Sequence, residues 1–121
     1  MAKESLKQRL DAVKDRSTLR LSTIGRKTSK RRTVTVWFLV DGETVYLVTS
    51  NMKRDWVRNV MKNGKVELNV ADEVLKGHGK KVDAKRLEHV KALLSHKYWA
   101  AWLGSWFGLG PEGAFVVTIE G

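Results

Sequence analysis

A two-residue turn signal between two apolar runs places the strongest constraint on the fold of this chain. Residues 33–40 read TVTVWFLV and residues 44–50 read TVYLVTS, with Asp41-Gly42 between them. Beta-branched and aromatic residues favour extended strands, and an Asp-Gly pair between two such runs favours a tight turn. The centre of the sequence therefore predicts two antiparallel strands that form a hairpin.

Four further strands and three helices follow from the hydrophobic spacing. Strands are predicted over residues 18–23, 65–71, 74–82 and 114–120, with a second hairpin turn at Asp72-Glu73. Helices are predicted over residues 3–15, over residues 56–61 with a stop at Asn63-Gly64, and after an N-cap at Asp83. The last of these helices is expected to continue or kink through residues 98–107.

The predicted elements follow the order helix, three strands, helix, two strands, helix and strand. Because the strands follow one another in hairpins and do not alternate with helices, this order argues against a parallel doubly wound sheet. It predicts a mainly β (α+β) fold, a small antiparallel six-stranded barrel with an N-terminal helix and further helices over its seams. The length of 121 residues fits a single domain over residues 1–121.

Composition narrows the classes of partner. The formal net charge of +10 predicts attraction to anions such as nucleic acid, acidic lipid or a phosphorylated small molecule. The absence of cysteine excludes disulfides, thiolate metal sites and thiol nucleophiles. The charged N-terminus lacks the apolar segment of a secretory signal, and no run is long enough to span a bilayer, so a cytoplasmic location is expected.

The positive charge is concentrated at one turn. Between the first two predicted strands, residues 25–32 read GRKTSKRR, and five of the seven residues from Arg26 to Arg32 are cationic. Gly25 permits a tight exit from the first strand, and the hydroxyls and amides of Thr28 and Ser29 add donors for a phosphate or carboxylates. From charge alone, this turn is either a solvated loop or an anion-binding site.

Two motifs resemble those of one known family. Residues 21–36 read LSTIGRKTSKRRTVTV, similar to the pattern L-T-T-x-G-R-K-S-G-x-x-R-x-x-P-L of the deazaflavin (F420)-dependent nitroreductase family. Residues 49–70 resemble that family's W-x-x-N-[LV]-x-x-N-P-x-V-x-V segment at Trp56, Asn59, Val60, Asn63, Val66 and Leu68. The family belongs to the split β-barrel superfamily, which also contains pyridoxamine-phosphate oxidase and many FMN-binding proteins.

Three features depart from the family pattern. Ser29 stands where the family usually has glycine, and Thr35 stands where it usually has proline. The loop over residues 51–55 is shorter than in typical members, and in the family this loop borders the cofactor ring.

The resemblance implies a split β-barrel that binds coenzyme F420, with FMN as the alternative cofactor. The cofactor site implied by the family has four parts. A basic loop binds the phosphate and acidic tail, a strand runs along the ring, the end of another strand faces the heterocycle, and two residues support that wall. In that order, the cofactor-binding residues are Arg26, Lys27, Thr28, Ser29, Lys30 and Arg32, then Thr35, Val36 and Trp37, then Thr49, Ser50 and Asn51, and finally Trp56 and Asn59.

The implied activity is hydride transfer from the reduced cofactor to an electron-poor acceptor such as a quinone, a nitro compound or an enone. The cofactor supplies most of that chemistry, so the protein orients the reactants and excludes water. Tyr98 is the one side chain predicted to give the acceptor a proton, with solvent as the alternative source. No metal site is expected, because His78, His89 and His96 lack ligand spacing.

Several alternatives remain open from the sequence. In the segment over residues 98–110, Trp99, Trp102 and Trp106 have helical spacing, which fits a core stripe, a substrate-pocket wall or peripheral membrane contact. The chain also fits an FMN-binding split-barrel reductase or carrier, or a basic nucleic-acid-binding domain, although it lacks the recognised nucleic-acid-binding motifs and no specific nucleic acid is expected. A homodimer is expected. The strand over residues 36–40 is apolar on both faces, which is compatible with a subunit interface as well as with a closed core.

Overall fold

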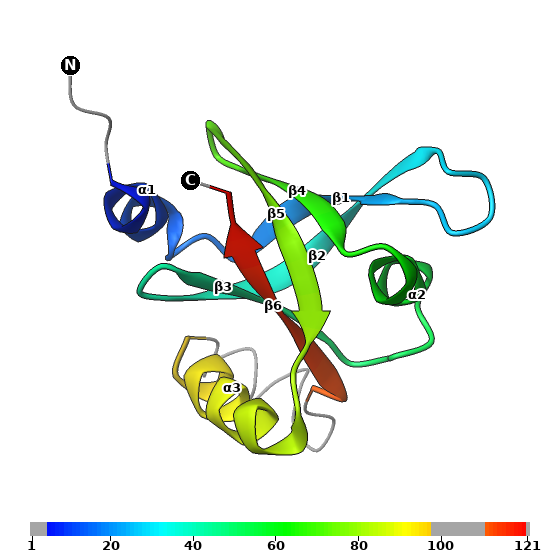
Figure 1. Cartoon of the computed structure of the whole chain (residues 1–121). Coiled ribbons are helices and arrows are strands. Elements are labelled where there is room, and N and C mark those ends of the chain that lie inside the picture. The colour runs from blue at the N-terminus through cyan, green and yellow to red at the C-terminus, as the bar shows by residue number, and fades with distance from the viewer. Residues whose placement is uncertain (1–4, 98–110, 121) are drawn as a thin grey trace.

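A computed structural model describes residues 5–97 and 111–120 (Figure 1). The elements in this part of the chain are α1 (Leu6–Val13), β1 (Thr18–Ile24), β2 (Arg31–Asp41), β3 (Thr44–Thr49), α2 (Asp55–Lys62), β4 (Lys65–Val70), β5 (Glu73–Lys81), α3 (Ala84–Lys97) and β6 (Gly113–Ile119). Their order is the one that the sequence predicts. The predicted continuation of the third helix through residues 98–107 lies outside the described residues.

The six strands form a closed barrel in the order β1-β2-β3-β6-β5-β4. Each neighbouring pair is antiparallel, and β4 closes the barrel against β1 over the short register from Arg20–Asn69 to Ser22–Glu67. The predicted antiparallel six-stranded barrel is therefore confirmed. The second strand begins two residues before its predicted start at residue 33, because Arg31 and Arg32 pair with Ile24 and Thr23 of β1.

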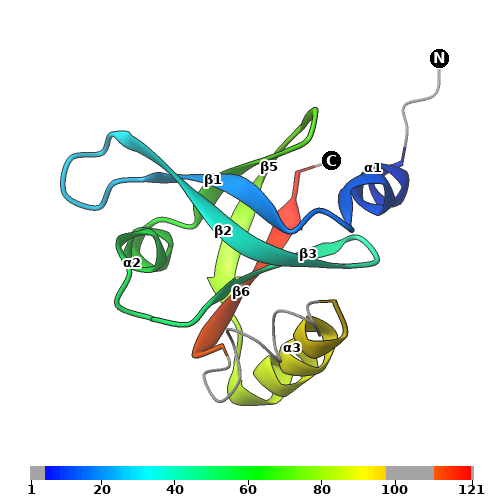
Figure 2. The ribbon, with the colours of Figure 1, turned by 180° about the vertical axis from the view of Figure 1, so that it is seen from behind.

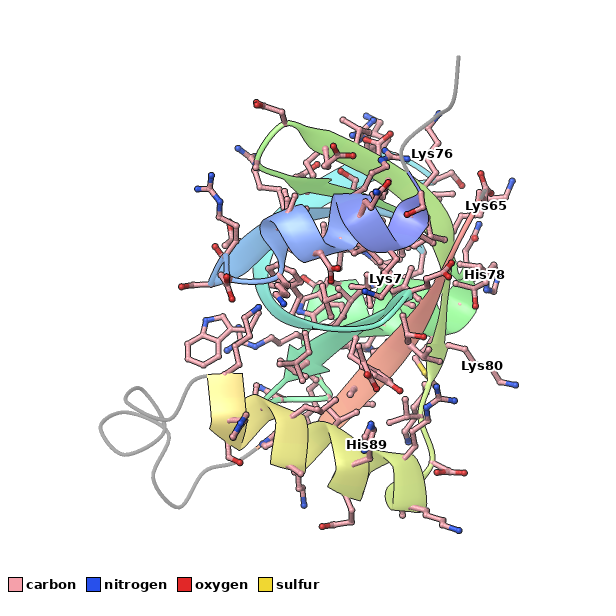
Figure 3. All side chains as sticks on the ribbon, turned by 90° about the vertical axis from the view of Figure 1, so that its left-hand side faces the viewer. Lys7, Lys65, Lys76, His78, Lys80 and His89 are labelled. Atoms are coloured by element: carbon pink, nitrogen blue, oxygen red, sulfur yellow. The ribbon has the colours of Figure 1, made fainter. Side chains whose placement is uncertain are left out.

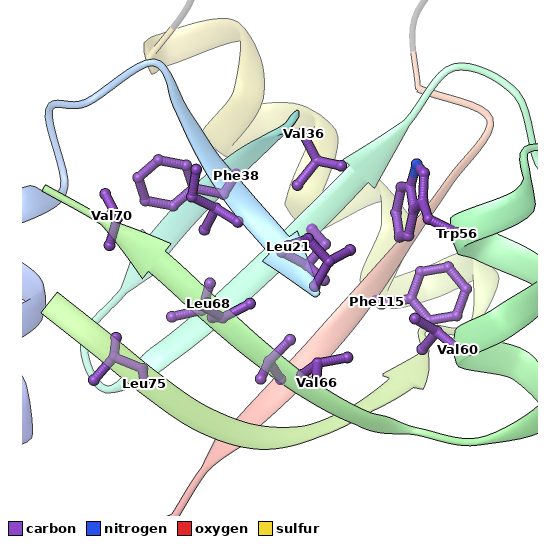
Figure 4. Packing of buried hydrophobic residues seen from close by; sticks show 14 of the residues in the cluster. Leu21, Val36, Phe38, Trp56, Val60, Val66, Leu68, Val70, Leu75 and Phe115 are labelled. Carbon is purple, nitrogen blue, oxygen red and sulfur yellow. The ribbon is translucent and has the colours of Figure 1, made fainter. Parts of the chain in front are cut away.

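Alternate residues of the strands fill the barrel interior. Leu21, Phe38, Leu68 and Phe115 come from four different strands and are each at most 1% exposed (Figure 4). Complete burial of such a side chain stabilises the fold by about 1.5–3 kcal/mol. The interior is therefore a packed core, and a ligand has to bind outside it.

Helices close the two ends of the barrel. Leu10 and Val13 of α1 join the interior core at one end, while Trp56, Val57 and Val60 of α2 join it at the other. Figure 2 shows α1 and α2 on opposite sides of the barrel. The first helix is shorter than the predicted range of 3–15, because the Ser5 side chain caps it by accepting a hydrogen bond from the Gln8 amide (3.1 Å).

The third helix covers the outside of the barrel wall formed by β2, β3 and β6. Leu39 and Tyr46 on that wall pack with Val90 and Leu94 of α3 in a second apolar cluster. The helix begins after Asp83, whose carboxylate accepts a hydrogen bond from the Arg86 amide (2.8 Å), as predicted for its N-cap. The two apolar faces of residues 36–40 are therefore buried within one chain, one in the barrel and one beneath α3.

Lys97 anchors the end of α3 to β2. Its Nζ donates a hydrogen bond to the Phe38 carbonyl oxygen (2.9 Å) and lies 3.9 Å from the centroid of the Phe38 ring. Burial lowers the pKa of Lys97 from 10.5 to about 8, and the nearby charge of Asp15 partly opposes this shift. This contact holds the end of the helix beside the strand that carries Trp37.

The outer face of β5 is polar and exposed. Lys76, His78 and Lys80 alternate with buried residues along this strand, and Lys65 of β4 lies opposite His78 (Figure 3). Two strands separate β5 from β2 in either direction around the barrel, so Lys76 and Lys80 lie on the wall opposite β2. Among the described helices, none is long and apolar enough to cross a membrane.

Candidate functional site

A groove lies between β2 and the N-terminal end of α2. The β1–β2 hairpin projects beyond the barrel beside α2 (Figures 1 and 2). The groove consists of two cavities of about 560 and 630 Å³, within the range of small-molecule sites. Val34, Asp55 and Trp56 line both cavities, so the two adjoin as the two ends of one groove.

The groove exists because β2 is longer than the strand that pairs with its second edge. Residues 31–36 pair with β1 alone, and β3 joins only from Trp37 onward. Successive residues of an antiparallel strand turn their backbone N–H and C=O groups to opposite sides. The two-residue turn makes Asp41 and Thr44 a hydrogen-bonded pair, so the backbone groups of Asp41 point to β3. Counted back from Asp41 in steps of two, the backbone groups of Thr35 and Thr33 point to the same side. On that side no described strand pairs with them, and they face the groove.

The loop at the basic end of the groove has a tight, defined backbone. The Gly25 amide donates to the Lys30 carbonyl oxygen and the Ser29 amide donates to the Gly25 carbonyl oxygen, both at 2.8 Å. A Cβ on residue 25 would lie 3.0 Å from Thr28 Oγ1 and 3.1 Å from the Lys30 carbonyl oxygen, so only glycine fits without displacement. Ser29 has a φ of 60°, in the left-handed region that favours glycine.

One buried amide fastens this loop to α2. The Asn59 side chain is 3% exposed, and its Oδ1 accepts hydrogen bonds from the Arg26 backbone amide (3.1 Å) and from Arg26 Nη1 (2.9 Å). Its Nδ2 donates to Thr23 Oγ1 (3.2 Å), and Arg26 Nη2 lies 3.2 Å from Asp55 Oδ1. Arg26 and Asn59, predicted from separate motifs, are thus parts of one hydrogen-bonded unit.

The other end of the groove is less charged and has an aromatic wall. Val36 and Trp37 of β2 line it together with Thr49 and Ser50, which follow the partner of Trp37 at the end of the neighbouring strand β3. Thr49 Oγ1 donates to the Asn51 carbonyl oxygen (2.9 Å) and accepts from the Asn51 amide (3.1 Å), which fixes the direction of the chain after β3.

Trp56 closes the floor between the two ends. It is 6% exposed and packs edge-on against Phe115, with ring centroids 5.7 Å apart and an interplanar angle of 60°. Because Phe115 belongs to the barrel core, the position of Trp56 is set by the interior packing.

The groove has a strongly positive lining. Six cationic residues and one acidic residue line it: Arg26, Lys27, Arg31, Arg32, Lys53, Arg54 and Asp55. Two of the cations already have anionic partners, since Arg26 pairs with Asp55 and Arg31 pairs with Glu67. The other four form no ion pair within the described part of the chain, so they retain charge for an anionic ligand.

The groove brings together eleven of the fourteen predicted cofactor-binding residues: Arg26, Lys27, Thr28, Arg32, Thr35, Val36, Trp37, Thr49, Ser50, Trp56 and Asn59. Ser29 instead lines a third cavity, of about 400 Å³, which also contains Lys65 and Lys76. Lys30 and Asn51 line none of these three cavities. Tyr98, the predicted proton donor, lies outside the described residues.

The predicted cofactor-binding residues leave out nine further residues of the lining: Thr23, Gly25, Arg31, Thr33, Val34, Val48, Lys53, Arg54 and Asp55. The cationic pair Lys53-Arg54 was the available signal, because it directly precedes the W-x-x-N motif. Val34 had no local signal, since its place in the groove follows from the register of β1 against β2. In the described ranges, no group of three His, Cys, Asp or Glu is arranged to hold a metal ion.

Solved structures share this fold. The chain is similar to an F420-H2-dependent reductase, FDR-A, at 24% identity and a TM-score of 0.65, covering 85% of this chain and 95% of that one. A structure described as a domain-swapped dimer is 24% identical with a TM-score of 0.67, covering 86% and 81%. A haem-binding protein from Mycobacterium smegmatis is 12% identical with a TM-score of 0.70, covering 99% of this chain and 53% of that one.

The sequence matches the model of one protein family. Residues 5–102 match the family described as F420H(2)-dependent quinone reductase, while no curated protein matches the chain. The matched range includes both motifs that carry the resemblance to deazaflavin-dependent reductases, and that resemblance is confirmed. Since the match spans most of the sequence, the chain belongs to the F420H(2)-dependent quinone reductase family and is an F420-dependent oxidoreductase.

Proposed function

We propose that F420 lies along the groove, with its acidic arm at the β1–β2 loop and its ring between β2 and the end of β3. The observation that carries this proposal is that the two cavities of the groove adjoin. A cationic cavity around Lys27 and Arg32 adjoins a cavity walled by Val36, Trp37 and Trp56, and the two share Val34, Asp55 and Trp56 in their lining. A ligand that joins an anionic chain to a flat ring requires a site divided in this way.

The basic end supplies charge to the anionic arm. Lys27 lies on the loop, Arg32 lies near the start of β2, and Thr28 lines the same cavity. A hydrogen bond to a charged group contributes about 1.5–3 kcal/mol. Two or three such bonds give roughly half of the ~8 kcal/mol that micromolar affinity requires, so contacts with the ring have to supply the remainder.

The ring end supplies surface and orientation. Trp37 and Val36 offer aromatic and apolar contact, and the unpaired backbone N–H and C=O of Thr35 offer a donor and an acceptor to the polar edge of a heterocycle. Thr49 and Ser50, at the end of the neighbouring strand, line the same cavity. Contacts from both strands would fix the plane of the ring, which is the main requirement for directed hydride transfer.

The proposed acceptor is a quinone, within the wider class of quinones, nitro compounds and enones. The reduced cofactor, when bound, supplies the hydride. The protein holds the ring against β2 and keeps water from it, while Tyr98 or solvent provides the proton that the acceptor takes up. The quinone is favoured because the matching family is described by that acceptor.

Titration with oxidised and reduced F420 tests the proposal. Lys27→Gln and Arg32→Gln should each raise the Kd for F420 by about 10- to 100-fold, the loss of roughly one charge-assisted bond. Lys80→Gln removes the same charge from the opposite wall of the barrel and should leave the Kd unchanged. The proposal is wrong if F420 does not bind, or if the Lys80 variant loses as much affinity as the groove variants.

The same titration with FMN and with DNA separates the alternatives. FMN binding tighter than F420 binding would favour an FMN-dependent split-barrel protein. Retention on DNA without binding of either cofactor would favour a nucleic-acid-binding domain.

We further propose that the protein is a cytoplasmic homodimer that also makes peripheral contact with membranes. The dimer is supported by a similar structure described as a domain-swapped dimer, and membrane contact by the net charge of +10. Light scattering measures the first, where a monomer mass would exclude the dimer. Co-sedimentation with anionic vesicles measures the second, where protein remaining in the supernatant would exclude the contact.

A further inference from the structure

We propose that Arg26 is a positioning residue, which locks the basic loop to α2 and so sets the distance between the two ends of the groove. The sequence pattern predicts Arg26 as a direct ligand of the anionic arm, but its side chain is directed to α2. This inference rests on the proposed function, because it assigns a role within the same groove.

The contacts around Arg26 form a clamp with several independent points. Asn59 Oδ1 accepts from both the backbone and the side chain of Arg26, at 3.1 and 2.9 Å. The guanidinium also donates to the Asp55 carbonyl oxygen (3.5 Å) and to Asp55 Oδ1 (3.2 Å). Lys62 Nζ closes the unit by donating to the Arg26 carbonyl oxygen (3.2 Å).

Burial indicates which contact contributes most to attaching the loop to α2. The Arg26 side chain is 16% exposed, whereas the Asp55 side chain is 86% exposed, so water weakens that ion pair. Asn59 is buried, and both ends of its amide have a partner. Its Oδ1 accepts from Arg26, and its Nδ2 donates to Thr23 Oγ1. Its amide is therefore the fixed point of the clamp, since a buried amide without partners would be costly.

The clamp acts on the whole groove. Asp55 and Trp56 of α2 line both cavities, while Lys27 and Arg32 line the basic cavity from the loop and β2. The β1–β2 hairpin projects beyond the barrel, so its tip needs a second attachment to keep a fixed distance from α2 (Figure 2). Arginine suits this role better than lysine, because its planar fork reaches Asn59 and Asp55 at once.

A measurement on the protein without cofactor tests the clamp directly. In Arg26→Gln, backbone amides of residues 26–30 should exchange hydrogen about tenfold faster, because the tip opens locally. Asn59→Asp keeps an acceptor for both Arg26 donors and should retain most of the protection. Arg58→Gln, the same substitution on the exposed side of α2, is the matched control and should leave exchange in the loop unchanged.

Binding of F420 then distinguishes a clamp from a direct ligand. A clamp requires the fork, so Arg26→Lys should raise the Kd nearly as much as Arg26→Gln, by about tenfold, and the salt dependence of the Kd should stay that of the wild type. Lys27→Gln should instead reduce the salt dependence, because it removes a charge that faces the arm.

Two results would overturn the inference. One is unchanged loop exchange in Arg26→Gln. The other is an Arg26→Lys variant that binds like the wild type while Arg26→Gln loses salt dependence, the behaviour of a direct charge contact. Failure of the wild type to bind F420 would instead remove the proposed function and leave the exchange experiment able to decide the structural role of Arg26.

Discussion

Ser29 has a backbone conformation that serine adopts at a cost. Its φ of 60° lies in the left-handed region, where a Cβ is unfavourable. The hydrogen bond from its amide to Gly25 keeps it there (2.8 Å). The family pattern usually has glycine at this position, and the observed φ gives the physical reason for that preference.

The substitution Ser29→Gly should therefore stabilise the protein. We expect a gain of roughly 0.5–1 kcal/mol, the cost of the left-handed conformation less the added entropy of glycine in the unfolded chain. Gly42→Ala is the converse substitution. Gly42 has a φ of 64°, so alanine there should destabilise the protein by a similar amount. Thermal unfolding of both variants measures the effect, and a lower Tm for Ser29→Gly would contradict it.

Among the secondary-structure elements, β2 determines where the groove can lie. It is the longest strand in the described chain, and its first half has β1 on one edge and the groove on the other. The family pattern has proline where this chain has Thr35. Proline lacks an N–H, and strands accept it only at an unpaired edge, which agrees with the orientation of Thr35 toward the groove.

Two proline substitutions test this assignment of the edges. Thr35→Pro removes an N–H that faces the groove and should cost less than about 1 kcal/mol. Val34→Pro removes an N–H that faces β1 and should cost about 3 kcal/mol or more. Chemical denaturation of the two variants gives the comparison, and a loss for Thr35→Pro as large as that for Val34→Pro would contradict this orientation of β2.

For the whole molecule, the charge has opposite consequences for stability and for binding. A net charge of +10 makes the folded chain repel itself. The same excess attracts the anionic arm of a cofactor, although the cations on β5 lie on the wall opposite the groove. Screening by salt should weaken both effects.

Raising the ionic strength from about 0.01 to 0.15 M should therefore increase the Tm of the cofactor-free protein and raise the Kd for F420. Lys80→Gln, on the wall opposite the groove, should reduce the salt dependence of the Tm and leave that of the Kd unchanged. Calorimetry and fluorescence titration over the same salt series measure the two quantities. A Tm that falls with salt would contradict the account of self-repulsion.

The order of the elements and the basic loop could be predicted from the sequence, because their causes are local. The turn at Asp41-Gly42, the cap at Asp83 and the alternation along the strands each depend on residues a few positions apart. The tight Gly25 turn belongs to the same class. These local features are sufficient to predict the barrel class and the cationic end of the groove without any contact between distant residues.

The tertiary structure alone decided which predicted residues meet and that the Arg26 side chain is directed to α2. The Arg26–Asn59 bonds join positions 33 residues apart, and the Arg31–Glu67 pair joins positions 36 apart. Such contacts depend on the register of β1 with its two neighbours and on the packing of α2 against the end of the barrel. A one-residue shift in register would exchange the two faces of β2. The turn at Asp41-Gly42 excludes that shift against β3, whereas the register of β1 against β4 is set only when the barrel closes.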